Sequence, residues 1–396
     1  MPFTFHHIIR PVCRPVCRPV CCDIIAAHAP LRLFAALFPL RLLAALSPLL
    51  LLAACSSETE PAPAISVPTP ITLGIYAAQP APSLTRADSS VMAYKTIPTD
   101  ASIGVYAYYH NNGEWNPAST PNFMFNQRAQ NTGTYGHLIY SPLKYWPNET
   151  ADHLSFIAYY PYISETPESD EAPDSPVKNK LTPLLNNTDE GLPTFFFSVN
   201  DDVKKQIDFL ISDFVPNQSK TNTTVRLLLR HATSKIEFRI VVDDDIQDDV
   251  AYFTLHSLCL TNIYKEGTYT PVYDAETETT TLQCLHNDTR KDIYNCTTTE
   301  AYLLLPQVIA ADALLKVNYD LAFKSKGTTG TYNATGQLVP ENAYVYSNAN
   351  AQVQLNTLTP EWLPSHHYIY TIRLRATRID FTAQVSPWGE YNWQPM

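Results

Sequence analysis

Two groups of side chains have the composition of metal sites. The run Asp243–Asp245 and the pair Asp248–Asp249 hold carboxylates that could bind a calcium ion. A calcium loop, however, places its carboxylates at fixed alternate positions around a turn glycine, and this run has no glycine. His366 and His367 are adjacent, and adjacent residues of a strand point to opposite faces. We therefore expect a solvated loop at the aspartates, no metal site at the histidines, and no cofactor.

The sequence also lacks the spacings on which common catalytic sites are built. It contains no phosphate-binding glycine loop, no GxSxG turn and no HExxH helix. Only 11 of the 396 residues are glycine, which is less than half of the roughly 7% found in an average chain. We predict that the protein is not an enzyme.

Three cysteines lie after residue 55, namely Cys259, Cys284 and Cys296. An odd number of thiols cannot all pair, so at most one disulfide can form among them. A zinc site is disfavoured because none of the three belongs to a CxxC pair. The pattern therefore predicts no metal site and leaves open whether two of the three cysteines form a disulfide.

Cys55 has a different context. Arg32 and Arg41 precede the apolar run 42–52, and Leu-Ala-Ala comes directly before Cys55. A basic flank, a short apolar stretch and small residues before the cut are typical of a signal peptide, and the run is too short to span a membrane. The order Leu-Ala-Ala-Cys is similar to the bacterial lipoprotein pattern, in which the cysteine is diacylated. We predict lipidation at Cys55, with two acyl chains that hold the protein on a membrane.

Several aromatic residues could stack on sugars. They are Trp115, Tyr145, Trp146, Tyr159 and Tyr160. Aromatic residues in the core or at the edges of a β-sandwich would produce the same composition. The sequence leaves both interpretations open.

The charge balance excludes one class of partner. The chain holds 27 Lys and Arg against 38 Asp and Glu, for a net charge of -11. The first 54 residues contribute five Arg and one Asp, so the rest is still more acidic. Nucleic-acid binding depends on clustered basic residues, and no such stripe is present. We expect a protein or surface partner and no nucleic acid.

The elements that would position these residues are short strands. Apolar residues alternate with polar ones over seven segments, and no long helical stripe follows residue 55. The segments are 71–77, 103–109, 154–160, 236–242, 315–323, 368–376 and 379–385. Loops rich in Pro, Asn and Asp separate them, which favours antiparallel β-sandwiches. The predicted fold class is all-β.

Changes in composition divide the chain. Residues 1–54 form a leader, and residues 55–70 are a linker rich in Pro, Ala, Ser and Thr. The polar run 217–224 is the expected boundary between two sandwich domains. These are an N-terminal β-sandwich at 71–218 and a C-terminal β-sandwich at 219–396.

Several segments, in their order and spacing, resemble the fimbrillins of Bacteroidales. The segment 225–236 is similar to the strand with an F-x-H-x-L-(S/A)-K pattern that opens the second domain of that family, with Leu229 where Phe is frequent. The other segments that carry the resemblance are Leu84–Ala87, Ile103–Tyr106, Tyr145–Pro147, Phe156–Pro161, Asp208–Ile211 and Phe381–Trp388. Together they extend over about residues 70–390.

The resemblance implies two transthyretin-like antiparallel β-sandwiches in tandem and a subunit of type V fimbriae. Such a subunit is exported as a lipoprotein, is cleaved by an Arg-specific surface protease and accepts a strand from its neighbour. Cleavage after Arg86 would remove the strand with Ile71, Leu73, Ile75 and Ala77 on one face. The candidate donor strand presents Ile379, Phe381, Ala383 and Val385. The same segment could instead be an ordinary last strand of its own domain.

Two functions follow as hypotheses. The first is a structural and adhesive subunit of surface fimbriae, whose partners are other fimbrial subunits in a homo- or heteropolymer. The second is a monomeric lipid-anchored surface protein that binds a glycan or a host protein. Both predict a surface-exposed lipoprotein of the outer membrane.

Overall fold

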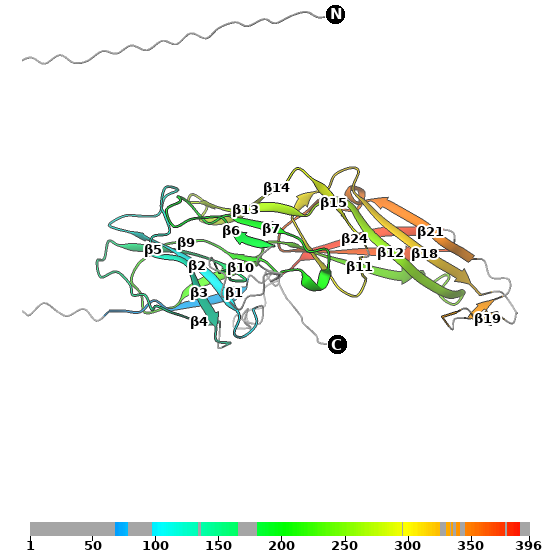
Figure 1. Ribbon diagram of the computed structural model, residues 1–396, viewed down its shortest axis with the longest axis horizontal. Coiled ribbons are helices and arrows are strands. Elements are labelled where there is room, and N and C mark those ends of the chain that lie inside the picture. Colours follow the sequence, from blue (N-terminus) through cyan, green and yellow to red (C-terminus); the bar gives the residue numbers. More distant parts are fainter. Residues whose placement is uncertain are drawn as a thin grey trace, which may run out of the picture. The chain divides into compact units, whose positions relative to one another are not determined.

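The structure of the protein is a computed structural model (Figure 1). It describes residues 68–77, 97–133, 136–164, 180–294, 296–324, 330–332, 334–335, 338–340, 345–376 and 378–388. The predicted leader, the lipidation site Cys55 and the cleavage site Arg86 lie outside these residues. Most of the 55–70 linker and the C-terminal residues 389–396 do so as well.

The described residues are almost entirely β-structure, so the all-β prediction is confirmed. Their helices are α1 (Leu355–Leu358) and the 3-10 turn η2 (Val203–Lys205). The strands of the first half are β1 (Leu73–Ala77), β2 (Ser102–His110), β3 (Met124–Asn131), β4 (His137–Tyr140), β5 (His153–Tyr160), β6 (Leu181–Pro183), β7 (Phe195–Ser198), β8 (Leu210–Ser212), β9 (Val215–Gln218), β10 (Val225–His231) and β11 (Ser234–Val242).

The strands of the second half complete the fold. They are β12 (Val250–Tyr264), β13 (Glu266–Asp274), β14 (Thr279–His286), β15 (Arg290–Ile293), β16 (Tyr302–Leu304), β17 (Gln307–Val308), β18 (Leu314–Phe323), β19 (Gly330–Tyr332), β20 (Leu338–Pro340), β21 (Val345–Gln354), β22 (Glu361–Trp362), β23 (His366–Leu374) and β24 (Ile379–Pro387). Each of the seven segments with alternating apolar residues forms or overlaps a strand.

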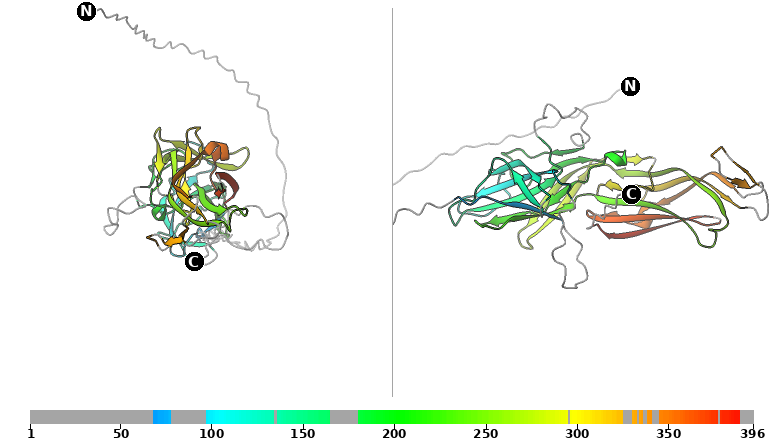
Figure 2. Two further views of the ribbon diagram at one scale, coloured as in Figure 1. Left: turned by 90° about the vertical axis from the view of Figure 1, so that its right-hand side faces the viewer. Right: turned by 90° about the horizontal axis from the view of Figure 1, so that it is seen from below.

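The first sheet closes on itself. Its order is β2-β3-β4-β1-β10-β8-β5, and β5 pairs again with β2, which makes a ring of seven strands with β9 attached to β5. In Figure 2 the blue β1 lies among the cyan and green strands of this sheet. The predicted pair of transthyretin-like sandwiches is therefore not confirmed, because the pairing around β1 forms a closed sheet.

The interior of the closed sheet is one hydrophobic core. The alternating apolar residues of its strands point inward, as the period of two requires. Its buried members include Ile71, Leu73, Ile75, Ile103, Val105, Ala107, Leu154, Phe156, Ala158, Val225, Leu227 and Leu229. Strand β1 is thus one of the strands that enclose this core.

Strands β2 and β5 are buried on both faces. Ile103 and Val105 face the closed core, whereas Tyr106 and Tyr108 are buried with Phe195 in a second core. Double burial explains why β2 reads as an almost continuous apolar run.

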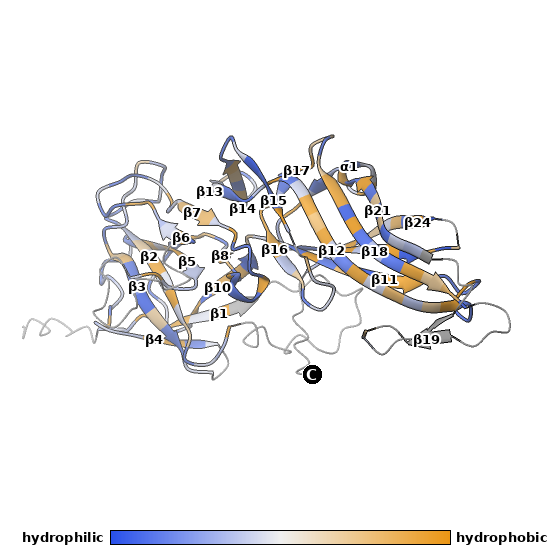
Figure 3. Ribbon diagram, turned by 45° about the vertical axis from the view of Figure 1, so that its right-hand side comes forward, coloured by the Kyte–Doolittle hydropathy of each residue, from blue (hydrophilic) through white to orange (hydrophobic). Residues whose placement is uncertain are grey.

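Three further four-stranded sheets surround the second core. Their orders are β16-β11-β23-β24, β15-β12-β18-β21 and β14-β13-β7-β6. Figure 3 shows hydrophobic and hydrophilic residues alternating along β12 and β18, which have one face on the core. Strands β17 and β22 form a two-stranded pair, and so do β19 and β20.

The predicted boundary after residue 218 precedes β10, but β10 pairs with β1 and β8 of the closed sheet. The division into domains at 71–218 and 219–396 thus stays a prediction. Among the described residues, no helix is both long and apolar enough to cross a membrane.

Candidate functional site

Strand β1, predicted to be removable, has a partner on each side. It runs parallel to β10 from the pair Leu73 and Val225 to the pair Ala77 and Leu229. On the other side it is antiparallel to β4, where Leu73 lies opposite Leu138. Removing β1 would therefore open the closed sheet and expose two strand edges at once.

Backbone hydrogen bonds extend the attachment of β1 beyond the strand itself. The N–H of Ile71 donates to the carbonyl oxygen of Lys144 at 2.9 Å. The N–H of Ile75 donates to the carbonyl oxygen of Gly136 at 2.9 Å. Gly136 has a positive φ of 71°, and a Cβ there would lie 2.3 Å from the carbonyl oxygen of Ile75. Only glycine fits this close approach.

The predicted apolar face of β1 is buried where it is described. Ile71 is 1% exposed, Leu73 is fully buried and Ile75 is 2% exposed. The backbone of Ala77 pairs with Leu229, and its side chain lies outside the described residues. Burial of each large side chain contributes roughly 1.5 to 3 kcal/mol to the free energy of unfolding. Ile71, Leu73 and Ile75 together therefore contribute roughly 5 to 9 kcal/mol before the conformational entropy of ordering the strand is subtracted.

The candidate donor strand, β24, pairs with β23 within the same chain. The two strands are antiparallel from the pair Leu374 and Ile379 to the pair His366 and Pro387. β24 is the last strand of its sheet, so its outer edge has no strand partner in the described part of the chain. This placement matches the alternative of an ordinary last strand, yet an edge strand can leave by breaking one ladder.

The four predicted donor residues are unequally buried. Ile379, Phe381 and Ala383 are half-buried and pack against the second core. Val385 is 50% exposed. Val385, at the end of this apolar face, can therefore contact a second molecule without prior unfolding.

The end of β24 is fastened to the end of β10. The indole of Trp388 stacks on the imidazole of His231, with ring centroids 3.6 Å apart and planes at 11°. The N–H of Trp388 donates to the carbonyl oxygen of Ser365 at 2.7 Å. The hydroxyl of Ser365 donates to the carbonyl oxygen of His231 at 2.8 Å, and Nδ1 of His231 lies 2.7 Å from Oδ1 of Asp208.

Strand β10 thus pairs with β1 and contacts the residue that follows β24. Its residues 225–229 pair with β1, and its last residue, His231, supports Trp388. Sequence reasoning missed this contact, although His231 and Trp388 both belong to the segments that carry the family resemblance.

The described residues contain no group of three or more His, Cys, Asp or Glu side chains that could hold a metal ion. The absence of a metal site from the chain stays a prediction. The aspartates at 243–249 form the turn between β11 and β12, and Asp243 pairs with Arg375 at 2.8 Å. Nε2 of His367 lies 3.0 Å from Oε2 of Glu237.

The three cysteines are free thiols. Burial raises the pKa of Cys259 to about 11 and the pKa of Cys284 and of Cys296 to about 12. The thiolate is the reactive form, so burial favours the less reactive, protonated form of these residues.

The predicted aromatic residues separate into two groups. Trp146 is 3% exposed and Tyr159 is fully buried, and both belong to the cores. Tyr145 is exposed, Tyr160 is half-buried, and Trp115 is half-buried and lines a pocket.

Comparison with known proteins gives one family. The sequence profile described as fimbrillin-like matches residues 85–388. A comparison with curated protein sequences gives no match.

One solved structure shares the fold, and two others are similar at lower TM-scores. A fimbrial protein from Bacteroides vulgatus is 21% identical, covers 80% of this chain and 99% of its own, and has a TM-score of 0.54. A candidate cell adhesion protein from Bacteroides uniformis is 18% identical, with coverages of 81% and 99% and a TM-score of 0.46. A fimbrial assembly protein from Parabacteroides distasonis is 9% identical, with coverages of 81% and 99% and a TM-score of 0.36. With most of its length matched by the family profile, the chain belongs to the fimbrillin-like family.

Proposed function

We propose that this protein is a structural and adhesive subunit of surface fimbriae. It is exported as a lipoprotein anchored to the outer membrane through Cys55. Cleavage after Arg86 by an Arg-specific surface protease then releases the anchor together with β1, because both precede Arg86 in the chain. The open sheet accepts the last strand of a neighbouring subunit.

One observation supports this proposal above the others: β1 completes a closed sheet although the next described strand, β2, begins only at Ser102. Removal leaves β4 and β10 with unpaired edges and leaves the core without Ile71, Leu73 and Ile75. An added strand with alternating apolar residues restores both the backbone hydrogen bonds and the buried surface. β24 has that pattern.

Proteolysis tests the trigger. The exported protein is treated with a trypsin-like protease, the new N-terminus is sequenced, and polymers are detected by size-exclusion chromatography and electron microscopy. We expect Ala87 as the new N-terminus, followed by polymers, and neither with the variant Arg86→Ala. A polymer that forms equally well without cleavage contradicts the trigger.

A matched pair of variants tests the donor strand. Val385→Asp places a charge on the predicted donor face at a residue that is half exposed, so the monomer should fold. Ser386→Asp places the same charge on the opposite, exposed side of β24. We expect Val385→Asp to abolish polymers and Ser386→Asp to preserve them. Equal polymer formation by both variants would instead point to another donor, and no polymer from either variant or from the unmodified chain would favour a monomeric surface protein.

Lipid labelling tests the anchor. We expect the unmodified chain to incorporate labelled palmitate and to fractionate with the outer membrane. Cys55→Ser should lose the label and appear in the soluble fraction, whereas Cys284→Ser should behave as the unmodified chain does. A membrane-bound, unlabelled wild-type protein would exclude anchoring through Cys55.

A further inference from the structure

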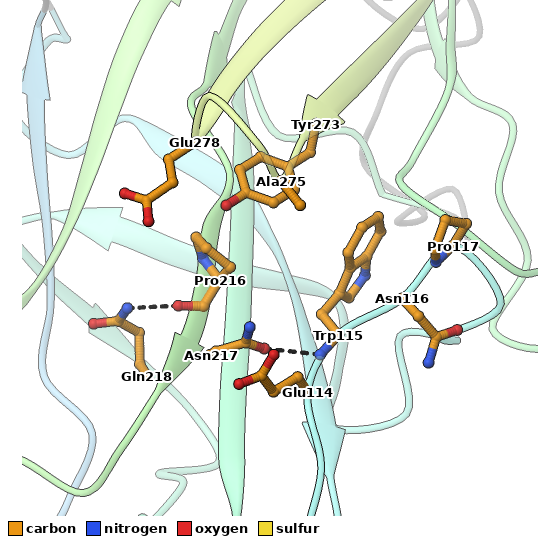
Figure 4. A pocket seen from close by; sticks show the side chains of 10 residues that line it. All are labelled: Glu114, Trp115, Asn116, Pro117, Pro216, Asn217, Gln218, Tyr273, Ala275 and Glu278. Carbon is orange, nitrogen blue, oxygen red and sulfur yellow. Dashed lines mark hydrogen bonds between the residues drawn. The ribbon is translucent and has the colours of Figure 1, made fainter.

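A pocket of about 680 Å³ lies away from β1 and β24. Its walls come from the loop after β2, from β9 and from the turn between β13 and β14. The lining residues, shown in Figure 4, are Glu114, Trp115, Asn116, Pro117, Pro216, Asn217, Gln218, Tyr273, Ala275 and Glu278. The volume falls within the range of roughly 300 to 1,000 Å³ of small-molecule sites.

The aromatic side of the pocket is held in place. The ring of Trp115 lies 4.9 Å from that of Phe214 and 6.0 Å from that of Tyr273, the latter at 83°. Phe214 also contacts Tyr273 at 5.1 Å. Three mutually packed rings lose little further rotamer freedom when a ligand binds, which favours affinity.

Three amide side chains line the pocket, those of Asn116, Asn217 and Gln218. In each of them one polar group already makes a hydrogen bond within the protein. Oδ1 of Asn217 accepts from the N–H of Trp115 at 2.7 Å, and Oδ1 of Asn116 accepts from a backbone N–H at 2.9 Å. Nε2 of Gln218 donates to the carbonyl oxygen of Pro216 at 2.6 Å. Two NH₂ groups and the amide oxygen of Gln218 therefore stay available, within the described part of the chain, to a ligand.

The remaining polar groups are acceptors, with one hydroxyl. Glu114 and Glu278 are exposed and make no hydrogen bond or ion pair with any residue that the structure describes. Burial, together with the charges of Glu278 and Asp274, raises the pKa of Tyr273, so its hydroxyl keeps its proton and can donate. The pocket thus offers donors and acceptors beside aromatic rings.

The balance of these groups selects the ligand class. Sugar hydroxyls both donate and accept hydrogen bonds, and the C–H face of a sugar ring packs on an aromatic ring. Two carboxylates without a lining Lys, Arg or His repel an anionic ligand, and a purely cationic ligand would leave the amide NH₂ groups unused. We propose that this pocket binds an uncharged saccharide.

Binding is tested by isothermal titration calorimetry on the full exported chain. The probes are lactose, N-acetyllactosamine, maltotriose, cellotriose and mannotriose, with 3'-sialyllactose as the anionic counterpart of lactose and a Gly-Arg-Gly peptide as a cationic probe. We expect at least one uncharged saccharide to saturate the protein, and the sialylated and cationic probes to bind at least about tenfold more weakly. Absence of saturation by every uncharged probe, or tighter binding of either charged probe, overturns the proposal.

Variants locate the site. Glu278→Gln and Gln218→Ala should each weaken saccharide binding by about three- to tenfold, and Trp115→Ala by more. Because Trp115→Ala removes a packed ring, the first two variants keep the test independent of folding. Glu276→Gln lies in the same turn outside the pocket and should bind as the unmodified chain does. Equal affinity of all four variants excludes this pocket. The proposed polymer formation depends on β1 and β24, which contribute no residue to the pocket, so the two proposals can fail separately.

Discussion

Strands β1 and β24 both carry an alternating apolar face, but they occupy opposite kinds of position. β1 has strands on both sides and buries Leu73 completely, whereas β24 has a strand on one side and leaves Val385 half exposed. Loss of β1 exposes a core and two edges, and loss of β24 breaks one ladder. Strand exchange requires that loss of the acceptor's own strand cost more free energy than release of the donor strand. The empty acceptor site must be unstable, and the donor strand must leave without unfolding its own domain.

Truncation tests the comparison with the largest expected effect. A chain that begins at Ala87 lacks β1 and should lose roughly 5 kcal/mol or more of its free energy of unfolding. A chain that ends at Arg378 lacks β24 and should keep a cooperative unfolding transition at a moderately lower urea midpoint. Urea denaturation, followed by near-UV circular dichroism at low protein concentration, measures both. A peptide of residues 68–77 should restore the first chain, and equal losses would refute the inequality.

Single side chains give a smaller version of the same test. Leu73→Ala should lower the free energy of unfolding by about 2 to 5 kcal/mol, because it leaves a cavity in the closed core. Val385→Ala should change it by about 0.5 kcal/mol or less, because the side chain is half exposed. Urea midpoints measured at a common slope compare the two. A Val385 variant as damaging as the Leu73 variant would show that β24 is buried in solution.

Trp388 is expected to affect only one end of β24. Trp388→Ala removes the ring stacked on His231, a contact worth about 0.5 to 1.5 kcal/mol, and leaves the backbone hydrogen bond to Ser365 without that support. Amide hydrogen exchange should accelerate at residues 384–387 and stay unchanged in β1. Val385→Ala serves as the control that keeps the stack. Faster exchange across the whole of β24 would indicate that Trp388 fastens the entire strand.

Acid should produce the smallest change. The hydrogen bond from Arg378, assisted by Arg375, lowers the pKa of Asp380 against the opposing effect of desolvation. Because the folded-state pKa is lower than the unfolded one, the stabilisation is present at neutral pH and is lost as the pH falls through the folded pKa. The protection factors at the start of β24, which compare its hydrogen exchange with that of an unfolded chain at the same pH, should therefore fall below about pH 4. In Asp380→Asn this acid-dependent part should vanish, and its persistence would assign the effect to other carboxylates.

The sequence predicted where the strands lie along the chain, but not which strands pair with one another. Alternation identified β1 and β24 because one face of each contacts a core. It could not show that β10 lies beside β1, since pairing between distant segments leaves no local pattern. The burial of Tyr106 and Tyr108 on the outer face of β2 was hidden for the same reason.

The functional residues divide in the same way. The apolar faces of β1 and β24 were predictable from spacing, whereas the exposure of Val385 depends on which strand ends the sheet. The stack of Trp388 on His231 joins residues far apart in the chain. Of the aromatic residues, the sequence could not separate the pocket residue Trp115 from the core residue Trp146, because both are flanked by polar residues and prolines.

The parallel pairing of β1 with β10 also affects the time course of folding. Thr72 and Thr223, which are 151 positions apart, meet at this pair, so the ring cannot close until the intervening strands have been synthesised. Contacts between such distant segments form slowly because long loops must close first. A newly synthesised chain therefore passes through an interval in which the place of its own β1 is empty. During that interval a strand from a second chain can compete for the same place, and its covalent connection to the rest of the chain gives β1 the higher effective concentration.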